Sequence, residues 1–370
     1  MNKPNPILLS AAVAVFLVTL FFGLNPKGYD FSNHVSWLSG RPGIHFDKYG
    51  IAYTQLDKNL LAGKTLSQDG FSIQMVIQPE SFKHNEFSHI LSLHDGRDPD
   101  QLLIGQWRSY IIVMNGDDYA HRRKTKRIYA QLASAPLEPV FFSITTGING
   151  SSIYINGQAV QSDIGLTLSI PDGNRPELII GNSVYGTNSW QGEVFGLAIH
   201  NHELSPGAIA SSFQTWSEEQ QFSSTGEERP VLLYLFDEKT GGSVINHAGG
   251  TFPLVIPSRL PLLKKHFLTG IIPESGLNRS FFMDAAINLA GFIPLGFFLS
   301  AVFLDLNGIF KKKAILFAVL FCFLTSLNIE LLQAWMPSRS SQSLDLILNT
   351  FGALIGAIPL TLTLKFSRLK

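Results

Sequence analysis

The sequence predicts a multi-domain membrane protein in which an antiparallel β-sandwich is inserted between one transmembrane helix and a bundle of three more. Hydrophobic residues make up 45% of the 370 residues and charged residues only 15%, well below the roughly 25% that is usual in soluble domains. The apolar residues gather in four long runs. Between the first and second runs lies a long segment of soluble composition with the turn pattern of short strands.

Charge and cysteine content exclude several classes of function. The chain has 28 Lys and Arg residues against 28 Asp and Glu residues, and this balance argues against nucleic acid as a partner. Cys322 is the only cysteine, so the chain has neither an intrachain disulfide nor a cysteine-based zinc site. The sequence also lacks a Walker loop, a nucleophile elbow and an HExxH helix.

The four apolar runs are predicted to cross the membrane. Residues 7–24 contain no charge and are long enough for a hydrocarbon core of about 30 Å. No small-x-small cleavage site follows them, so we favour an uncleaved anchor over the alternative, a cleaved signal peptide. The other three spans, within the region 284–365, are residues 285–304, 314–334 and 346–364.

Lysine and arginine in the short loops predict the orientation, because these residues stay in the cytoplasm. With four crossings, Lys3, the three lysines at 311–313 and the basic tail at 365–370 fall on one side. We therefore expect a multi-pass protein of the cytoplasmic membrane. Residues 31–258, the predicted sandwich, would lie on the extracytoplasmic side.

Short alternating segments divided by turn residues predict the strands of this domain. Asn156-Gly157 is a strong signal for a two-residue hairpin. One helix is expected at 207–221, with Ser205 as its N-cap and Pro206 in its first turn. The strands are expected at residues 71–79, 102–114, 140–146, 152–156 and 177–181.

Several of these segments resemble the laminin-G-like, concanavalin A-type jelly-roll family. The similar stretches are FSIQMVIQP, ITTGINGSSIYINGQAV and LIIGNSVYGTNSWQGEVFGLAIHNHELSPGAI. LLYLFDEKTGGSVINHAGG resembles a strand that usually opens such domains, although here it lies near the end. The resemblance implies binding of a glycan or an envelope protein. Hydrolysis of a glycan is not expected, because the E-x-D-x-x-E strand of glucanases on this fold is missing.

Two charged loops of the sandwich each allow two interpretations. The basic run at residues 121–127 (HRRKTKR) is either a solvated hairpin, which we favour, or a contact with phosphates of a membrane surface or an envelope polymer. The acidic loop with carboxylates from Asp95 to Asp100 is either an ordinary turn, which we favour, or a Ca²⁺ site. No other cofactor is expected.

The membrane spans carry polar residues at their predicted outer ends. These residues form pairs three or four positions apart, which places each pair on one helix face. A carboxylate deep in a membrane costs on the order of 2.5–3.5 kcal/mol, so such groups persist where they pair or bind a ligand. The alternative is a purely structural role as interhelical contacts. The predicted ligand-binding residues are Asp284, Asn288, Glu330, Gln333, Arg339, Asp345 and Asn349.

The same stretches resemble the VanZ-like membrane family. DAAINLAGFIPLGFFLS and SLNIELLQAWMPSRSSQSLDLILNTFGALIGAIP carry the family's pattern. The resemblance implies a protein of the bacterial cell envelope with a link to glycopeptide tolerance. It also includes positions other than the polar residues named above. The positions that match are Asp284, Asn288, Phe292, Pro294, Gly296, Ser326, Glu330, Gln333, Arg339, Asp345, Asn349, Gly352 and Gly356.

Three functional hypotheses follow. The leading one is binding of a membrane lipid or lipid-linked envelope precursor by the outer polar cluster, with Arg339 on an anionic group of the head group. The second is an enzyme that acts on a lipid-linked substrate, with Glu330 or Asp345 as general acid or base. The third is a structural adaptor in the envelope with no small ligand.

Overall fold

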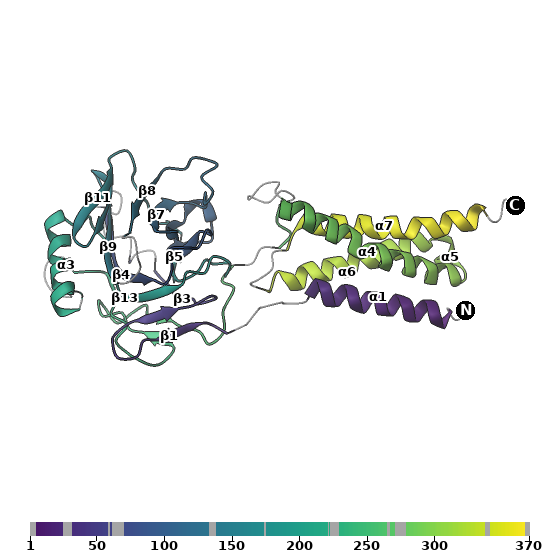
Figure 1. Ribbon diagram of the computed structural model, residues 1–370, viewed down its shortest axis with the longest axis horizontal. Coiled ribbons are helices and arrows are strands. Elements are labelled where there is room, and N and C mark those ends of the chain that lie inside the picture. The colour runs from purple at the N-terminus through teal and green to yellow at the C-terminus, as the bar shows by residue number, and fades with distance from the viewer. Residues whose placement is uncertain are drawn as a thin grey trace. The chain divides into compact units, whose positions relative to one another are not determined.

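The chain forms two compact units in the computed structural model, Asp30–Lys264 and a second unit built from Met1–Tyr29 with Lys265–Lys370. Figure 1 shows the first unit as a β-structure and the second as a group of helices. The structure describes residues 5–24, 32–57, 60, 70–132, 138–173, 175–220, 222, 229–264, 267–270, 279–336 and 341–366, without the side chains of 99, 279–280 and 360–366.

The first unit is a sandwich of two antiparallel sheets, which confirms the predicted fold class. One sheet has the order β1 (Val35–Trp37), β2 (Ile44–Phe46), β13 (Gly192–His200), β4 (Phe71–Pro79), β9 (Val140–Gly147), β10 (Gly150–Ile155) and β11 (Gln158–Asp163), and β14 (Leu232–Tyr234) also pairs with β13. The other has the order β15 (Ser243–Val244), β16 (Leu254–Val255), β3 (Ala52–Gln55), β12 (Glu177–Ile180), β5 (Ser88–His94), β6 (Leu102–Trp107), β7 (Tyr110–Asn115) and β8 (Arg127–Gln131). A 3₁₀ turn occupies Asp98–Asp100.

Apolar side chains from the inner faces of both sheets form the core. They include Ile73, Met75 and Ile77 of β4, which are fully buried. Trp190 is also buried there, and its indole N–H donates to the Gln106 amide oxygen over 2.6 Å. Burial of these large side chains supplies the main favourable free energy of folding.

Local sequence signals predicted one hairpin turn and one helix start of the sandwich, and missed another turn. Asn156 and Gly157 both have positive φ, as a two-residue hairpin turn requires. Helix α3 spans Pro206–Glu219, and the Ser205 hydroxyl accepts a hydrogen bond from the backbone N–H of Ala208, as an N-cap does. The single strand predicted at 102–114 is wrong, because the chain turns after β6 and returns as β7. Arg108 at the turn has φ +53°, a conformation that its residue type does not signal.

The second unit consists of helices α1 (Pro6–Leu24), α4 (Arg279–Asp305), α5 (Ile309–Lys312), α6 (Ala314–Gln333) and α7 (Ser343–Phe366). Three of them are long and apolar enough to cross a membrane, with mean hydropathies of 2.7 for α1, 2.0 for α4 and 2.2 for α6. The described apolar part of α7 is Ser343–Pro359. Helices α4 and α7 begin before the apolar runs that predicted them, because hydropathy marks the hydrocarbon boundary and polar residues can extend a helix beyond it.

Glycines bring α4 and α7 into close contact. A Cβ atom on Gly352 would lie 2.1 Å from the Leu289 carbonyl oxygen, and one on Gly356 would lie 2.0 Å from that of Ile293. Gly352 and Gly356 therefore form a close packing surface between the two helices. Because successive contacts advance by four residues on both helices, α4 and α7 run parallel, and their first turns lie at the same end of the bundle (Figure 1).

Candidate functional site

The outer face of one sheet carries a groove lined by aromatic rings. It has a volume of about 880 Å³ and lies over β6, β7 and β8. The rings of Trp107 and Tyr110 are stacked at an interplanar angle of 27° with centroids 6.3 Å apart, and Tyr129 meets Tyr110 edge-on at 6.1 Å. Trp107 and Tyr129 are 38% and 52% exposed, so their ring surfaces are accessible to a ligand.

Strand alternation places these rings on the outer face. Ile111 and Val113 of β7 belong to the core, so Tyr110 and Ile112, which alternate with them, face outward. The register then pairs Trp107 with Tyr110, and Ile112 with Tyr129. Cross-strand neighbours on one face lie close together, so three strands supply one continuous apolar floor.

A loop between β7 and β8 forms the basic wall of the groove, and it is organised around the buried carboxylate of Asp118. The two Asp118 oxygens accept hydrogen bonds from the backbone N–H groups of Arg122 at 2.8 Å and Thr125 at 3.0 Å. Burial opposes ionisation of this carboxyl, but donation from the loop backbone outweighs it and holds the pKa of Asp118 below its ordinary value. The charge of Asp118 thereby fixes the path of the loop.

The basic run at 121–127 divides between structural and groove-lining roles. Arg123 forms an ion pair with Asp117, and Arg127 lies 3.7 Å from Asp118. The groove is lined by three cationic side chains and one carboxylate, together with the polar His121 and Thr125. The charged lining residues are Lys124, Lys126, Arg127 and Asp163.

A buried histidine lies next to the floor of the groove. His89 is 1% exposed and contacts the rings of Phe87 and Tyr119, both of which line the groove. Neither ring nitrogen of His89 has a hydrogen-bond partner among the described residues. Its burial, together with the nearby His94, lowers the pKa of His89 to about 3, so this ring is a neutral packing element at physiological pH.

The carboxylates of the loop from Asp95 to Asp100 already have cationic or hydrogen-bonding partners. Arg97 pairs with Asp95 at 2.7 Å and with Asp100 at 3.1 Å. Asp98 accepts hydrogen bonds from the Tyr185 hydroxyl at 2.6 Å and from Lys264 at 3.3 Å, and also contacts His94. The predicted alternative of a Ca²⁺ site in this loop stays a prediction.

Near the C-terminal end of α6, Glu330 is buried at 1% exposure. Its carboxylate accepts a hydrogen bond from the backbone N–H of Gln342 over 2.8 Å. Next to it, the backbone of Ser341 accepts from the N–H of Thr269 at 2.9 Å. The chain segments before α4 and before α7 are therefore joined by hydrogen bonds at the level of the Glu330 carboxylate.

Two amides of the predicted cluster are buried in the bundle. The Gln333 side chain donates to the Gly23 carbonyl oxygen at the end of α1, over 2.7 Å. Asn349 donates to the Ser326 hydroxyl over 2.9 Å. The amide oxygen of Asn349 is buried and has no hydrogen-bond partner within the described ranges.

The other predicted ligand-binding residues differ in how far their side chains are buried. Asp284 is exposed on α4, while Asn288 and Asp345 are partly buried. Asp345 is close enough to Glu330 to interact with it electrostatically. Arg339 lies outside the described residues. The structure thus brings Glu330 and Asp345 together, while Asn349 pairs with Ser326, a residue outside the predicted ligand set.

The aromatic residues of the groove were missed by sequence analysis. The available signal was the sequence QWRSYIIVM, because an aromatic residue on each side of Arg108-Ser109 indicates a cross-strand pair once the turn is recognised. Interpreting 102–114 as one strand hid the pair. Tyr129 could have been found from the alternation of R-I-Y-A-Q after the basic run.

Comparisons with known proteins identify both parts of the chain. Residues 53–210 match the model of the concanavalin A-like lectin/glucanases superfamily, and residues 212–364 match the VanZ/LLP1 family model. Both predicted resemblances are thereby confirmed. The VanZ/LLP1 match begins inside α3 and so includes the last strands of the sandwich. No curated protein matches the chain.

Solved structures with similar folds are only distantly related in sequence. A protein from Bacteroides ovatus named for carbohydrate binding is 13% identical with a TM-score of 0.41, over 60% of this chain and 61% of that one. The receptor-binding domain of botulinum neurotoxin type G is 16% identical with a TM-score of 0.36, over 50% of this chain and 45% of that one. The chain thus spans less than two thirds of the length of either protein.

Proposed function

From a chain that joins a VanZ-like region to a concanavalin A-like sandwich, we propose that this membrane protein displays its sandwich on the extracytoplasmic side of the membrane and binds an acidic glycan in the aromatic groove. The observation that carries the proposal is the groove over β6, β7 and β8, with Trp107, Tyr110 and Tyr129 as its platform. Its volume of about 880 Å³ lies within the roughly 300–1,000 Å³ typical of small-molecule sites.

The composition of the groove favours a saccharide with a negative charge. Flat aromatic rings match the apolar C–H face of a sugar ring, and they lose little conformational entropy on binding. Lys124 and Lys126 line the basic wall and would attract a carboxylate or phosphate group. Asp163 lies on β11, a strand of the other sheet, and also lines the groove. Its carboxylate offers an acceptor for sugar hydroxyls.

The proposed orientation follows from the helical unit alone. The start of α1, the end of α7 and α5 with its lysines lie at one end of the bundle (Figure 1). The C-terminal end of α1 and the start of α4, between which the sandwich is inserted, lie at the other end. Because lysine-rich loops stay in the cytoplasm, the sandwich would lie on the extracytoplasmic side of a bacterial cytoplasmic membrane.

Replacing Trp107 with alanine is expected to weaken glycan binding about tenfold or more, because an exposed aromatic anchor is lost. Full-length protein in mild detergent would be applied to a glycan array that contains acidic and neutral members, and the hits would be titrated by calorimetry. Ile148→Ala removes an apolar side chain that is 88% exposed elsewhere on the sandwich and is expected to leave binding unchanged. Binding that survives Trp107→Ala, or a preference for neutral glycans, would contradict the proposal.

A second candidate function, binding of a lipid or lipid-linked precursor head group, is favoured by the buried polar groups of the bundle. The Asn349 amide oxygen has no partner in the described part of the chain, and burial without a hydrogen bond costs free energy. A ligand hydroxyl or amide that enters beside Asn349 would satisfy it. Arg339, in the connection before α7, would meet an anionic group, and the link to glycopeptide tolerance would follow from capture of a precursor.

Asn349→Leu and Arg339→Ala are each expected to remove a specifically bound lipid, because one loses the amide contact and the other the cationic contact. The measurement is lipid mass spectrometry on full-length protein purified in mild detergent. Ser300→Ala is the matched control, since Ser300 is a buried residue of α4 whose hydroxyl donates only to its own helix, at the Phe297 carbonyl.

Lipid profiles that are identical in the parent and all three variants would leave the polar cluster as interhelical contacts, as expected for the adaptor hypothesis, in which no small ligand binds. Turnover of the retained lipid by purified parent, lost in Glu330→Gln, would replace binding with catalysis. Each result therefore selects one of the three hypotheses for the membrane unit.

A further inference from the structure

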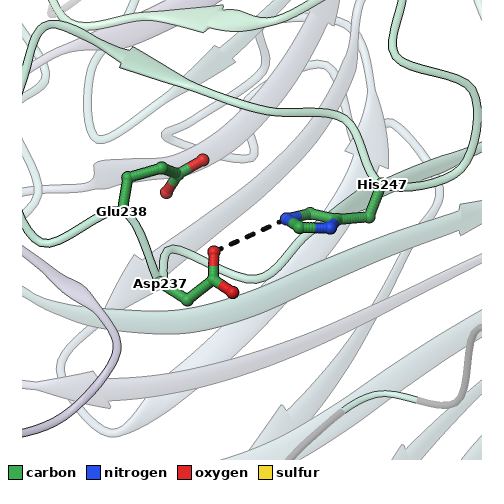
Figure 2. A group of neighbouring side chains, drawn as sticks. All are labelled: Asp237, Glu238 and His247. Atoms are coloured by element: carbon green, nitrogen blue, oxygen red, sulfur yellow. Dashed lines mark ion pairs between the residues drawn. The ribbon is translucent and has the colours of Figure 1, made fainter.

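Three side chains that could bind a metal converge at the sheet edge after β14. Asp237 and Glu238 follow Phe236 in the chain, and His247 comes three residues after β15. Figure 2 shows both carboxylates and the imidazole directed toward a common space. One potential ligand atom from each residue lies within 4.8 Å of the others, and the His247 Nε2 atom is 3.5 Å from an Asp237 oxygen.

The backbone on both sides of this cluster is fixed by hydrogen bonds. The N–H of His247 donates to the Leu233 carbonyl of β14, and the N–H of Gly43 donates to the Phe236 carbonyl, each over 2.8 Å. Asn246 accepts from the N–H of Leu233 at 2.9 Å. The ligand atoms are therefore presented by ordered chain and need little rearrangement to close on an ion.

One carboxylate oxygen of the cluster has no hydrogen-bond partner. Glu238 Oε1 accepts from the backbone N–H of Ile245 over 2.5 Å, which fixes the side chain. Glu238 Oε2 is buried and has no partner in the described portion of the chain. A buried carboxylate oxygen without a partner is costly, and a bound cation would remove that cost.

The donor set indicates which metal would bind. One imidazole nitrogen with two carboxylates suits zinc and related transition metals, whereas Ca²⁺ and Mg²⁺ prefer oxygen ligands only. Tetrahedral zinc, with ligands at about 2.0–2.1 Å, holds its ligand atoms about 3.3 Å apart. The His247 and Asp237 atoms at 3.5 Å are close to this separation, and a Glu238 oxygen lies within 4.8 Å of both.

We infer that Asp237, Glu238 and His247 form a binding site for one divalent transition metal ion of the zinc class. Three protein ligands leave a fourth coordination position, and the 48% and 32% exposed side chains of Asp237 and His247 leave that position open to water. Bound metal would join the segment after β14 to the segment after β15. The inference is independent of the glycan groove, which lies over β6, β7 and β8.

Calorimetric titration of untagged full-length protein, stripped with a chelator, would test the site with ZnCl₂, MnCl₂ and CaCl₂. One equivalent of zinc is expected to bind at least about tenfold more tightly than calcium. Glu238→Gln and His247→Gln are expected to weaken zinc binding about tenfold or more, because each removes a direct ligand. His84→Gln, which removes an exposed loop histidine outside the cluster, is the control and should bind zinc like the parent.

Equal zinc affinity in the parent and both variants, or an equal loss in His84→Gln, would overturn the site. Calcium binding as tight as zinc binding would overturn the metal class. If a metal-free variant melts at a lower temperature than the metal-free parent, X-ray absorption of the zinc-loaded parent tests the site instead, by identifying the zinc ligands. One imidazole with oxygen neighbours at about 2.0–2.1 Å is expected, and a shell with several imidazoles would contradict the assignment.

Discussion

Gly356→Ala is expected to destabilise the helical unit by about 1–3 kcal/mol, and the double replacement with Gly352→Ala by more. The added methyl group on Gly356 would lie 2.0 Å from the carbonyl oxygen of Ile293 and 3.0 Å from the backbone nitrogen of Phe297. Backbone atoms cannot rotate away as a flexible side chain can, so α4 and α7 must separate. Overpacking in a tight interface costs on this order, and in a membrane no gain in apolar burial offsets the lost contacts.

Gly291→Ala is the matched control for this prediction, because Gly291 lies in α4 and an added Cβ there would have no neighbour within 4 Å. Alanine is the better helix former by about 1 kcal/mol, so this variant should be equally stable or slightly more stable. Unfolding of the full-length protein in detergent, followed by helical circular dichroism, compares the variants. Equal destabilisation at Gly291 and Gly356 would show that helix propensity, and not interhelical distance, controls the result.

The same contact has a consequence for the polar cluster. Because the glycines fix the parallel register of α4 and α7, they place Asp284, near the start of α4, close to the level of the first turn of α7, which contains Asp345. A variant that separates these helices should therefore also change lipid retention. Gly291→Ala should not change it, since that surface of α4 has no neighbour near the glycine.

Sequence signals that act locally predicted the structure well. The Asn156-Gly157 turn and the Ser205 N-cap each depend on residues close in the chain. Their physical basis is the absent Cβ, the positive φ and the capping hydroxyl. Such features can be predicted without knowledge of the tertiary structure.

Sites formed across strands were not predictable in this way. Trp107, Tyr129 and Asp163 come from three strands of two sheets, and their approach depends on register and on a turn at Arg108 that uses no glycine. Likewise, Glu238 and His247 approach each other through contacts that residue types do not signal, such as the hydrogen bond from the N–H of His247 to the Leu233 carbonyl of β14. The spacing of three and four residues predicted shared helix faces, but it could not predict that the backbone of Gln342 would bind Glu330.

Asp118→Ala is expected to open the basic wall of the groove and to weaken glycan binding about tenfold. The substitution leaves the backbone N–H groups of Arg122 and Thr125 without their acceptor and Arg127 without its nearest carboxylate. Unpaired buried donors cost on the order of 1–3 kcal/mol, so the loop should leave this conformation. Amide exchange in residues 119–126 should accelerate. Asp172→Asn, which changes a carboxylate with a 91% exposed side chain, should alter neither exchange nor binding.

Acidification tests the same interaction without a substitution. The pKa of Asp118 in the folded protein lies below the ordinary value of 3.8, so its contribution to stability is complete above about pH 4 and is lost as pH falls toward the folded pKa. Titration of Asp118 should therefore leave glycan binding by the parent nearly unchanged between pH 7 and about pH 5. Amide exchange in the loop should accelerate only in stronger acid. In Asp118→Ala the loop should already exchange rapidly at neutral pH, with no further acceleration from this source on acidification. If the loop of the parent opens between pH 5 and 7, a different group must titrate there. That result would contradict the role of the Asp118 carboxylate in holding the basic wall.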